Sequence, residues 1–129
     1  MTTRLPLVAA QPGIWMAERL STLPGAWSVA HYVELRGDID PVLLGRAIIT
    51  GLSQADTLSM RFCEDSGEAW QWVDERRVFA DADYQDLRAA SDPHAAALAR
   101  MQADLGQNLR VDGGNPLVCH QLLRVGDNR

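Results

Sequence analysis

The sequence predicts a layered α/β domain in which helices pack on a mixed or mostly antiparallel sheet. Apolar residues recur at helical spacing after two Asp-Pro pairs, Asp40-Pro41 and Asp92-Pro93, a combination typical of a capped helix start. Shorter segments around them alternate apolar and polar residues with the period of two that half-buried strands show. Because the two patterns alternate along residues 1–129 without a repeat, we expect one domain rather than separate helical and strand units.

The first half of the chain should hold two helices separated by a strand. Residues 9–20 should form the first helix, because Pro12 then lies in the first turn, where proline is tolerated. Residues 26–35 alternate in period two and predict a strand. Asp40 should cap the second helix, whose wide apolar stripe we expect to be the best-buried helical face. This stripe comprises Leu44, Ala47, Ile48, Gly51, Leu52 and Ala55.

The second half should begin with a β-hairpin formed by residues 58–63 and 69–73. Asp65-Ser66-Gly67 between them is a hairpin-loop signal. Trp70 and Trp72 lie two apart on the second strand and point the same way. With Trp27 they could line a ligand surface, but alternating aromatic residues on strands are more often core, so we expect them to face the core. The remaining elements should be a short strand within 78–87, a helix from Pro93, a break at Gly113-Gly114 and a final strand at 117–125. The apolar side of that helix comprises His94, Ala97, Leu98, Met101 and Leu105.

Composition excludes several functions. The 129 residues carry a formal net charge of −5, and all 12 basic residues are arginine, with only Arg76-Arg77 adjacent. Without lysine the chain has no P-loop, Schiff-base or pyridoxal-phosphate lysine, and without clustered basic residues it has no nucleic-acid footprint. We expect no membrane span and no secretory signal. The distant Cys63 and Cys119 fit the reduced thiols of a cytoplasmic protein.

We expect no catalytic residue, cofactor site or metal site among these residues. His31, His94 and His120 lie far apart, each in a setting typical of a structural or surface imidazole. Cys119 and His120 are consecutive on the predicted last strand, so they should point to opposite faces and cannot form a nucleophile–base pair. The histidines and cysteines lack the short ligand spacing of a zinc site, and the paired aspartates lack the pattern of a calcium loop.

Several segments resemble, in order, the opening part of a non-ribosomal peptide synthetase condensation domain. The first is 7–16, in which a glutamine precedes an apolar helix that carries tryptophan. The second is 35–40, a strand end, glycine turn and aspartate cap followed by a helix. The third, 54–62, stands where the family shows Arg-His-Glu-x-Leu-Arg-Thr-x-Phe, and the last comprises 86–88 and 109–117. Each is weak alone, but their collinearity over nearly the whole chain identifies it as a member of this family.

The resemblance implies the fold and chemistry of a longer enzyme. Residues 1–129 would be an incomplete N-terminal lobe of a chloramphenicol-acetyltransferase-like domain, ending before the catalytic His-His-x-x-x-Asp-Gly segment, so this chain alone should be inactive. The parent enzyme would join 2,3-dihydroxybenzoate to serine through an amide during siderophore biosynthesis. Both substrates would arrive on phosphopantetheine arms, one on an aryl carrier protein and one on a peptidyl carrier domain. The alternative is a non-catalytic α/β module that binds a carrier or another protein.

One departure from the family pattern concerns residues that would support the catalytic loop. The family arginine after the leucine of the third segment is replaced by Ser59. In relatives this arginine is thought to hold the aspartate of the catalytic segment, which orients the loop that bears the histidine. Because residues 59 and 61 of one strand project to the same face, we expect Arg61 beside Ser59 to take over part of this role.

The resemblance also concerns the edge of the sheet. In the family the catalytic segment directly follows the strand expected at 117–125 and should continue the same sheet. The chain alone should therefore expose unpaired backbone groups along this edge and self-associate through it.

Overall fold

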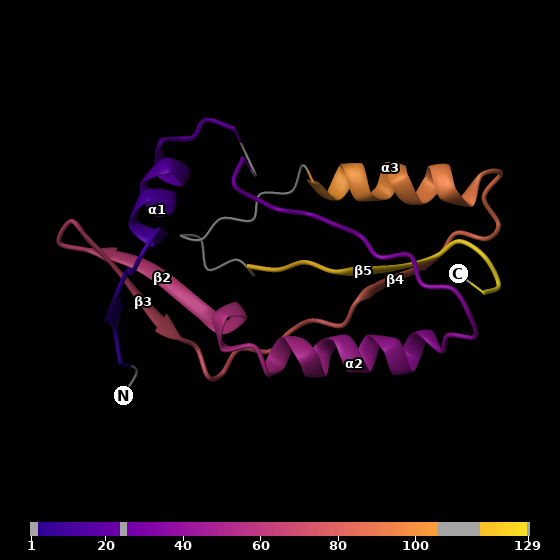
Figure 1. Ribbon diagram of the computed structural model, residues 1–129, viewed down its shortest axis with the longest axis horizontal. Helices are drawn as coiled ribbons and strands as arrows, with labels where there is room; N and C mark the ends of the chain where they lie inside the picture. The colour runs from indigo at the N-terminus through magenta and orange to yellow at the C-terminus, as the bar shows by residue number, and fades with distance from the viewer. Residues whose placement is uncertain (1–2, 24–25, 106–116, 129) are drawn as a thin grey trace.

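The computed structural model describes residues 3–23, 26–105 and 117–128. It confirms a layered α/β domain, with two small sheets (Figure 1). One sheet is antiparallel, with strand order β1-β3-β2, and the other is a parallel pair of β4 and β5. The strands are β1 (Leu5–Pro6), β2 (Met60–Asp65), β3 (Glu68–Val73), β4 (Asp83–Asp86) and β5 (Gln121–Arg124). The helices are α1 (Gln11–Leu20), α2 (Pro41–Ser53) and α3 (Pro93–Leu105), with a 3₁₀ turn η1 (Asp56–Ser59).

A helix lies on each side of the parallel pair. Figure 1 shows β4 and β5 between α2 and α3, while α1 and the antiparallel sheet lie at the end of the molecule away from the C-terminus. A Cβ atom added to Gly45 of α2 would lie 3.8 Å from Leu122 Cδ1 of β5. Arg100 of α3 donates from Nη2 to Asp83 Oδ2 of β4 at 3.0 Å. The two helices therefore enclose a thin layer rather than a wide sheet.

The two Asp-Pro signals work as the sequence predicts. The Asp40 carboxylate accepts hydrogen bonds from the backbone N–H groups of Val42 and Leu43, at 2.8 and 3.1 Å. Asp92 Oδ1 accepts from Ala95 N at 3.0 Å at the start of α3. Each carboxylate satisfies backbone donors that the first helical turn leaves without partners, so the start of each helix is determined locally.

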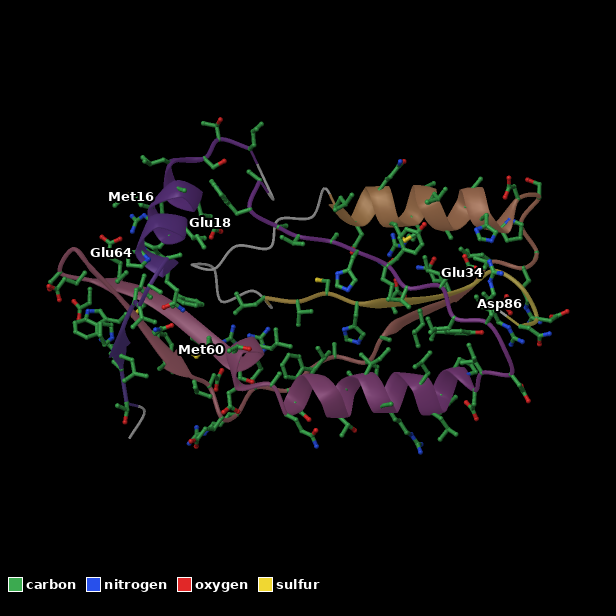
Figure 2. All side chains as sticks on the ribbon, viewed as in Figure 1. Met16, Glu18, Glu34, Met60, Glu64 and Asp86 are labelled. Atoms are coloured by element: carbon green, nitrogen blue, oxygen red, sulfur yellow. The ribbon has the colours of Figure 1, made fainter. Side chains whose placement is uncertain are left out.

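The expected hairpin is present, and α1 covers one face of it. Ser66 and Gly67 adopt φ values of 55° and 84°, as the two central residues of a type I′ hairpin turn require. Trp15 of α1 is 7% exposed, and its ring lies 6.2 Å from that of Phe62 on β2. Arg19 of α1 forms an ion pair with Glu64, which Figure 2 shows beside this helix. Helix and hairpin are thus joined by an aromatic contact and a charged one.

The expectation that Trp70 and Trp72 face the core is wrong. Both are only half-buried, and the buried residue of β3 is Gln71 between them, at 5% exposed. Gln71 pairs with Phe62 across the hairpin, so its side chain lies on the face that α1 covers. Because strand residues alternate between faces, the two tryptophans lie on the other face.

The apolar stripe of α2 is not the best-buried helical face. No residue of α2 is buried, whereas Trp15 of α1 and Ala97 of α3 are, at 7% and 6% exposed. Ile48, at the centre of the stripe, is half-buried. The stripe meets only the narrow two-stranded layer, which covers too little of the helix to remove a side chain from water.

Residues 26–35 do not form the predicted strand. The backbone of residues 28–36 runs without ladder hydrogen bonds, and Val29, Tyr32 and Val33 are 92%, 66% and 71% exposed. A strand needs a neighbour that accepts and donates backbone hydrogen bonds, and none of the described strands forms a ladder with this segment. One hydrogen bond fixes its end, from Gly37 N to Asn128 O at 2.9 Å.

Smaller differences concern the ends of elements. The first hairpin strand begins at Met60 because Asp56–Ser59 forms a 3₁₀ turn, and the last strand covers Gln121–Arg124 rather than 117–125. The short strand β1 was not predicted. The expected break at Gly113-Gly114 lies outside the described residues. None of the helices in 3–23, 26–105 and 117–128 has the length and apolar content to cross a membrane.

Candidate functional site

Asp74 joins the end of the hairpin to the two residues singled out by the sequence. Its backbone N–H donates to Ser59 O at 2.9 Å, and its Oδ2 accepts from Arg61 Nε at 3.2 Å. Its Oδ1 also accepts from the backbone N–H of Arg76 at 3.2 Å. The Arg61 and Asp74 side chains are 25% and 29% exposed, so this ion pair is shielded from water more than the surface pairs. Asp74 therefore holds η1, β2 and the connection after β3 together.

The structure changes the expected relation between Ser59 and Arg61. Ser59 ends η1 and does not lie on β2, whereas Arg61 is the second residue of that strand. They therefore do not project from one strand face, and the strand argument that paired them is wrong. A 3₁₀ turn places successive side chains about 120° apart, so strand alternation does not apply to Ser59. Their relation runs instead through Asp74, which binds the backbone of one and the side chain of the other.

A cleft of about 530 Å³ opens on this side of the molecule. Its wall comes from the ends of β2 and β3, the connection to β4, α3 and the residues that precede β5. Among its lining residues are the charged side chains Arg61, Asp74, Arg76, Arg77, Asp81, Asp83, Arg100 and Asp104, with His120. The sequence draws attention to Arg76-Arg77 and His120 separately. It gives no signal for Asp74 and Arg100, because their place in the cleft depends on segments far apart in the chain.

Burial perturbs two groups of this cleft. The Arg77 guanidinium lies over the Phe79 ring, 5.1 Å from its centroid. Partial burial, followed by repulsion from Arg61, lowers the pKa of Arg77 from its usual value. Cys119 as a whole is exposed, but partial burial of its thiol, followed by the Asp104 charge, raises the pKa of that thiol, so this cysteine is a poor nucleophile at neutral pH.

The histidines and cysteines stay apart. His31 lies in the exposed segment without strand pairing, His94 lies in the first turn of α3, and His120 directly precedes β5. Cys119 is exposed and His120 half-buried, and no hydrogen bond between their side chains is present in the described part of the chain. The described residues also contain no group of three His, Cys, Asp or Glu side chains that could hold a metal ion.

Charged side chains of the segment 86–88 connect the end of β4 to the C-terminal turn. Arg88 donates from Nη2 to Asp86 Oδ2 at 2.6 Å and from Nη1 to Asp127 Oδ1 at 2.7 Å. Hydrogen bonds from Arg88 lower the pKa of Asp86 to about 2. Leu87 N donates to Arg124 O at 2.8 Å and prolongs the β4–β5 ladder by one bond. Figure 2 shows Asp86 close to the C-terminal turn that this arginine ties to the sheet.

Gln11, the glutamine of the segment 7–16, links the start of α1 to β3 through its side-chain amide. Gln11 donates from Nε2 to Gln71 Oε1 at 2.9 Å, and Gln71 donates back from Nε2 to Gln11 Oε1 at 3.0 Å. Gln71 Nε2 also donates to Pro6 O at 2.9 Å, and Gln11 Oε1 accepts from Val8 N at 2.8 Å. This network explains why a polar side chain is the buried residue of β3, since its amide is hydrogen-bonded.

Comparison with known proteins decides the family. The sequence model of the family described as Condensation domain matches residues 1–129. The chain belongs to the condensation domain family. It is 65% identical over 129 residues to enterobactin synthase component F of Escherichia coli (strain K12), covering 100% of this chain and 10% of that protein. It is 34% identical over 126 residues to an isonitrile lipopeptide synthase of Streptomyces coeruleorubidus, covering 97% of this chain and 8% of that protein.

Solved structures confirm the fold. The starter condensation domain of rhizomide synthetase RzmA matches with a TM-score of 0.79 and 33% identity, over 98% of this chain and 30% of that chain. The first condensation domain of the CDA synthetase matches with a TM-score of 0.79 and 25% identity, over 98% of this chain and 33% of that chain. The chain thus spans about a tenth of its enterobactin synthase relatives and about a third of the solved domains. The chloramphenicol-acetyltransferase-like fold expected from the resemblance is confirmed.

Proposed function

We propose that this chain is part of a condensation domain that joins carrier-bound 2,3-dihydroxybenzoate to carrier-bound serine in enterobactin, and thus siderophore, biosynthesis. The observation that carries the proposal is the 65% identity to enterobactin synthase component F along the whole chain. The substrates are those that this likeness suggests. The phosphopantetheine arms belong to the partners, an aryl carrier protein and a peptidyl carrier domain, and a cytoplasmic location agrees with unpaired Cys63 and Cys119.

In the proposed reaction the serine amine attacks the carbonyl carbon of the aryl thioester. A C–N bond forms, the C–S bond breaks, the amine loses a proton, and the aryl carrier's thiol is released. The family assigns the proton step to a His-His-x-x-x-Asp-Gly segment, and no such segment occurs in these 129 residues. His31, His94 and His120 come from three separate elements. The part played by this chain would therefore be to shape and support the site, while a histidine outside these residues does the chemistry.

Support of the catalytic loop by Ser59 and Arg61 is a further part of this proposal. Arg61 is held by Asp74, which leaves the guanidinium in a defined orientation. In the longer enzyme, Arg61→Gln should lower the rate of condensation, whereas Ser59→Arg, which restores the family arginine, should keep or raise it. Asp74→Asn is the matched control, because it breaks the same ion pair but keeps the Arg61 guanidinium, so it should lower the rate less than Arg61→Gln does. Equal losses of rate and stability in Arg61→Gln and Asp74→Asn would mean that Arg61 only secures the hairpin.

The function is tested by direct product detection. An aryl carrier protein is loaded with 2,3-dihydroxybenzoate and a peptidyl carrier domain with serine, and the aryl-seryl thioester is sought by mass spectrometry. The 129-residue chain should give no product above background, and a chain that continues through the histidine segment and second lobe should turn over. Product from the shorter chain that disappears when His31, His94 or His120 is replaced would contradict the proposal. An inactive longer chain that still binds the loaded aryl carrier would favour the alternative, a non-catalytic carrier-binding module.

A further inference from the structure

We propose that the cleft lined by Arg77, Arg100 and His120 binds a small oxyanion, either a carboxylate or a phosphate group. Each of these three residues carries a buried side-chain nitrogen without a hydrogen-bond partner among the described residues. The atoms are Arg77 Nη1, Arg100 Nε and His120 Nε2, and all three residues line the same cleft. A buried N–H group without an acceptor is costly and uncommon, so two arginine N–H groups in one cleft, beside an imidazole nitrogen that donates when it carries a proton, indicate that an acceptor belongs there.

Among the charges that line the cleft, Arg77 is the one on which the proposal depends. Four arginines and four aspartates line the cleft, and two Arg–Asp ion pairs use two of each. Asp74 pairs with Arg61 at 3.2 Å and Asp83 pairs with Arg100 at 3.0 Å. Arg77 forms no ion pair with the described residues, although its guanidinium is partly buried over Phe79. The Asp74 charge acts on Arg77 but is also paired with Arg61, so a bound oxyanion would add a counter-charge of its own to Arg77.

The aspartates also limit how much negative charge the ligand can carry. Asp83 holds Arg100 by Nη2, which orients the guanidinium and leaves Nε available to a ligand. Asp81 is exposed and Asp104 half-buried at the same cleft. A polyanion would meet these carboxylates, whereas a single carboxylate or phosphate group can bind between two guanidinium groups and avoid them. The volume of about 530 Å³ lies within the range of small-molecule sites.

The proposal concerns a site in the N-terminal lobe and does not depend on amide formation. It is tested on the 129-residue chain by NMR, with the Arg Nε–H and His ring signals observed while inorganic phosphate is added at constant ionic strength. Acetate is titrated in a second series, so that the two sources of the oxyanion are distinguished. Saturable shifts of the Arg77, Arg100 and His120 signals are expected with at least one of the two anions.

Two variants make the assignment specific. Arg77→Gln should raise the dissociation constant about tenfold or more, as expected for the loss of a hydrogen bond to a charged group. Arg4→Gln is the matched control, because it removes the same charge from an exposed residue that pairs with Asp65 at 3.4 Å, and it should leave binding unchanged. His120→Phe is the second variant, used if Arg77→Gln unfolds the chain, and it should also weaken binding. Absence of saturable shifts with both anions, or equal weakening by Arg4→Gln, would overturn the proposal and leave only water at these nitrogens.

Discussion

Replacing Trp15 should be the most damaging single change to this fold. Trp15 is 7% exposed and is the large side chain through which α1 packs on the hairpin. A buried tryptophan removes about 150–250 Å² from water, which at roughly 25 cal/mol per Å² amounts to about 4–6 kcal/mol. Because burial measured against an extended chain is an upper bound, Trp15→Ala should lower the free energy of unfolding by about 3–5 kcal/mol, the usual range for such a change in a core.

The measurement is urea unfolding followed by far-UV circular dichroism. Trp27→Ala is the matched control, since Trp27 is 55% exposed and its loss should change stability by about 0.5 kcal/mol or less. Trp15→Phe should recover much of the loss, because a ring would still meet Phe62, which lies 6.2 Å away. Equal shifts of the unfolding midpoint in Trp15→Ala and Trp27→Ala would refute the argument, because they would mean that α1 does not cover the hairpin.

Three further predictions concern the cap of α2, the contact between Asp86 and Arg88, and the edge of β5. Asp40→Ala should lower the free energy of unfolding by about 1 kcal/mol, because α2 loses its cap. Asp38 does not cap the helix, so Asp38→Ala should change the free energy of unfolding little, and equal changes of the two variants in urea unfolding would contradict the cap. The pKa of Asp86 should be about 2 by carboxyl ¹³C NMR and should rise in Arg88→Gln. Since the pKa of Asp86 is depressed in the folded protein, its contribution to stability should be complete above the ordinary aspartate pKa of about 4 and be lost as the pH falls towards 2. An unchanged pKa of Asp86 in Arg88→Gln would exclude this contact as the cause. The chain should self-associate with rising concentration, because β5 pairs on only one side among the described strands, and a concentration-independent monomer mass by light scattering would contradict this.

Local chemistry in the sequence determined where α2 and α3 begin and where the hairpin turns. Asp40 and Asp92 cap their helices with their own carboxylates, and Ser66-Gly67 closes the hairpin with its own backbone angles. These interactions span a few residues, so a reader of the sequence can recognise them without knowing the fold. The placement of His31, His94 and His120 on three separate parts of the chain was also predictable, whereas Cys119 and His120 precede β5, so the strand argument about their faces does not apply.

Only the tertiary structure decided which faces are covered and which charged residues meet. Residues 26–35 have a strand pattern but form no ladder with a described strand, and Gln71 rather than Trp70 is buried because α1 covers its face of the hairpin. The cleft likewise joins Arg77 to Arg100 and His120 across long stretches of sequence. Periodicity tells which side chains share a face of one element, but the burial of that face depends on what packs against it, and that contact is made by residues far away in the chain.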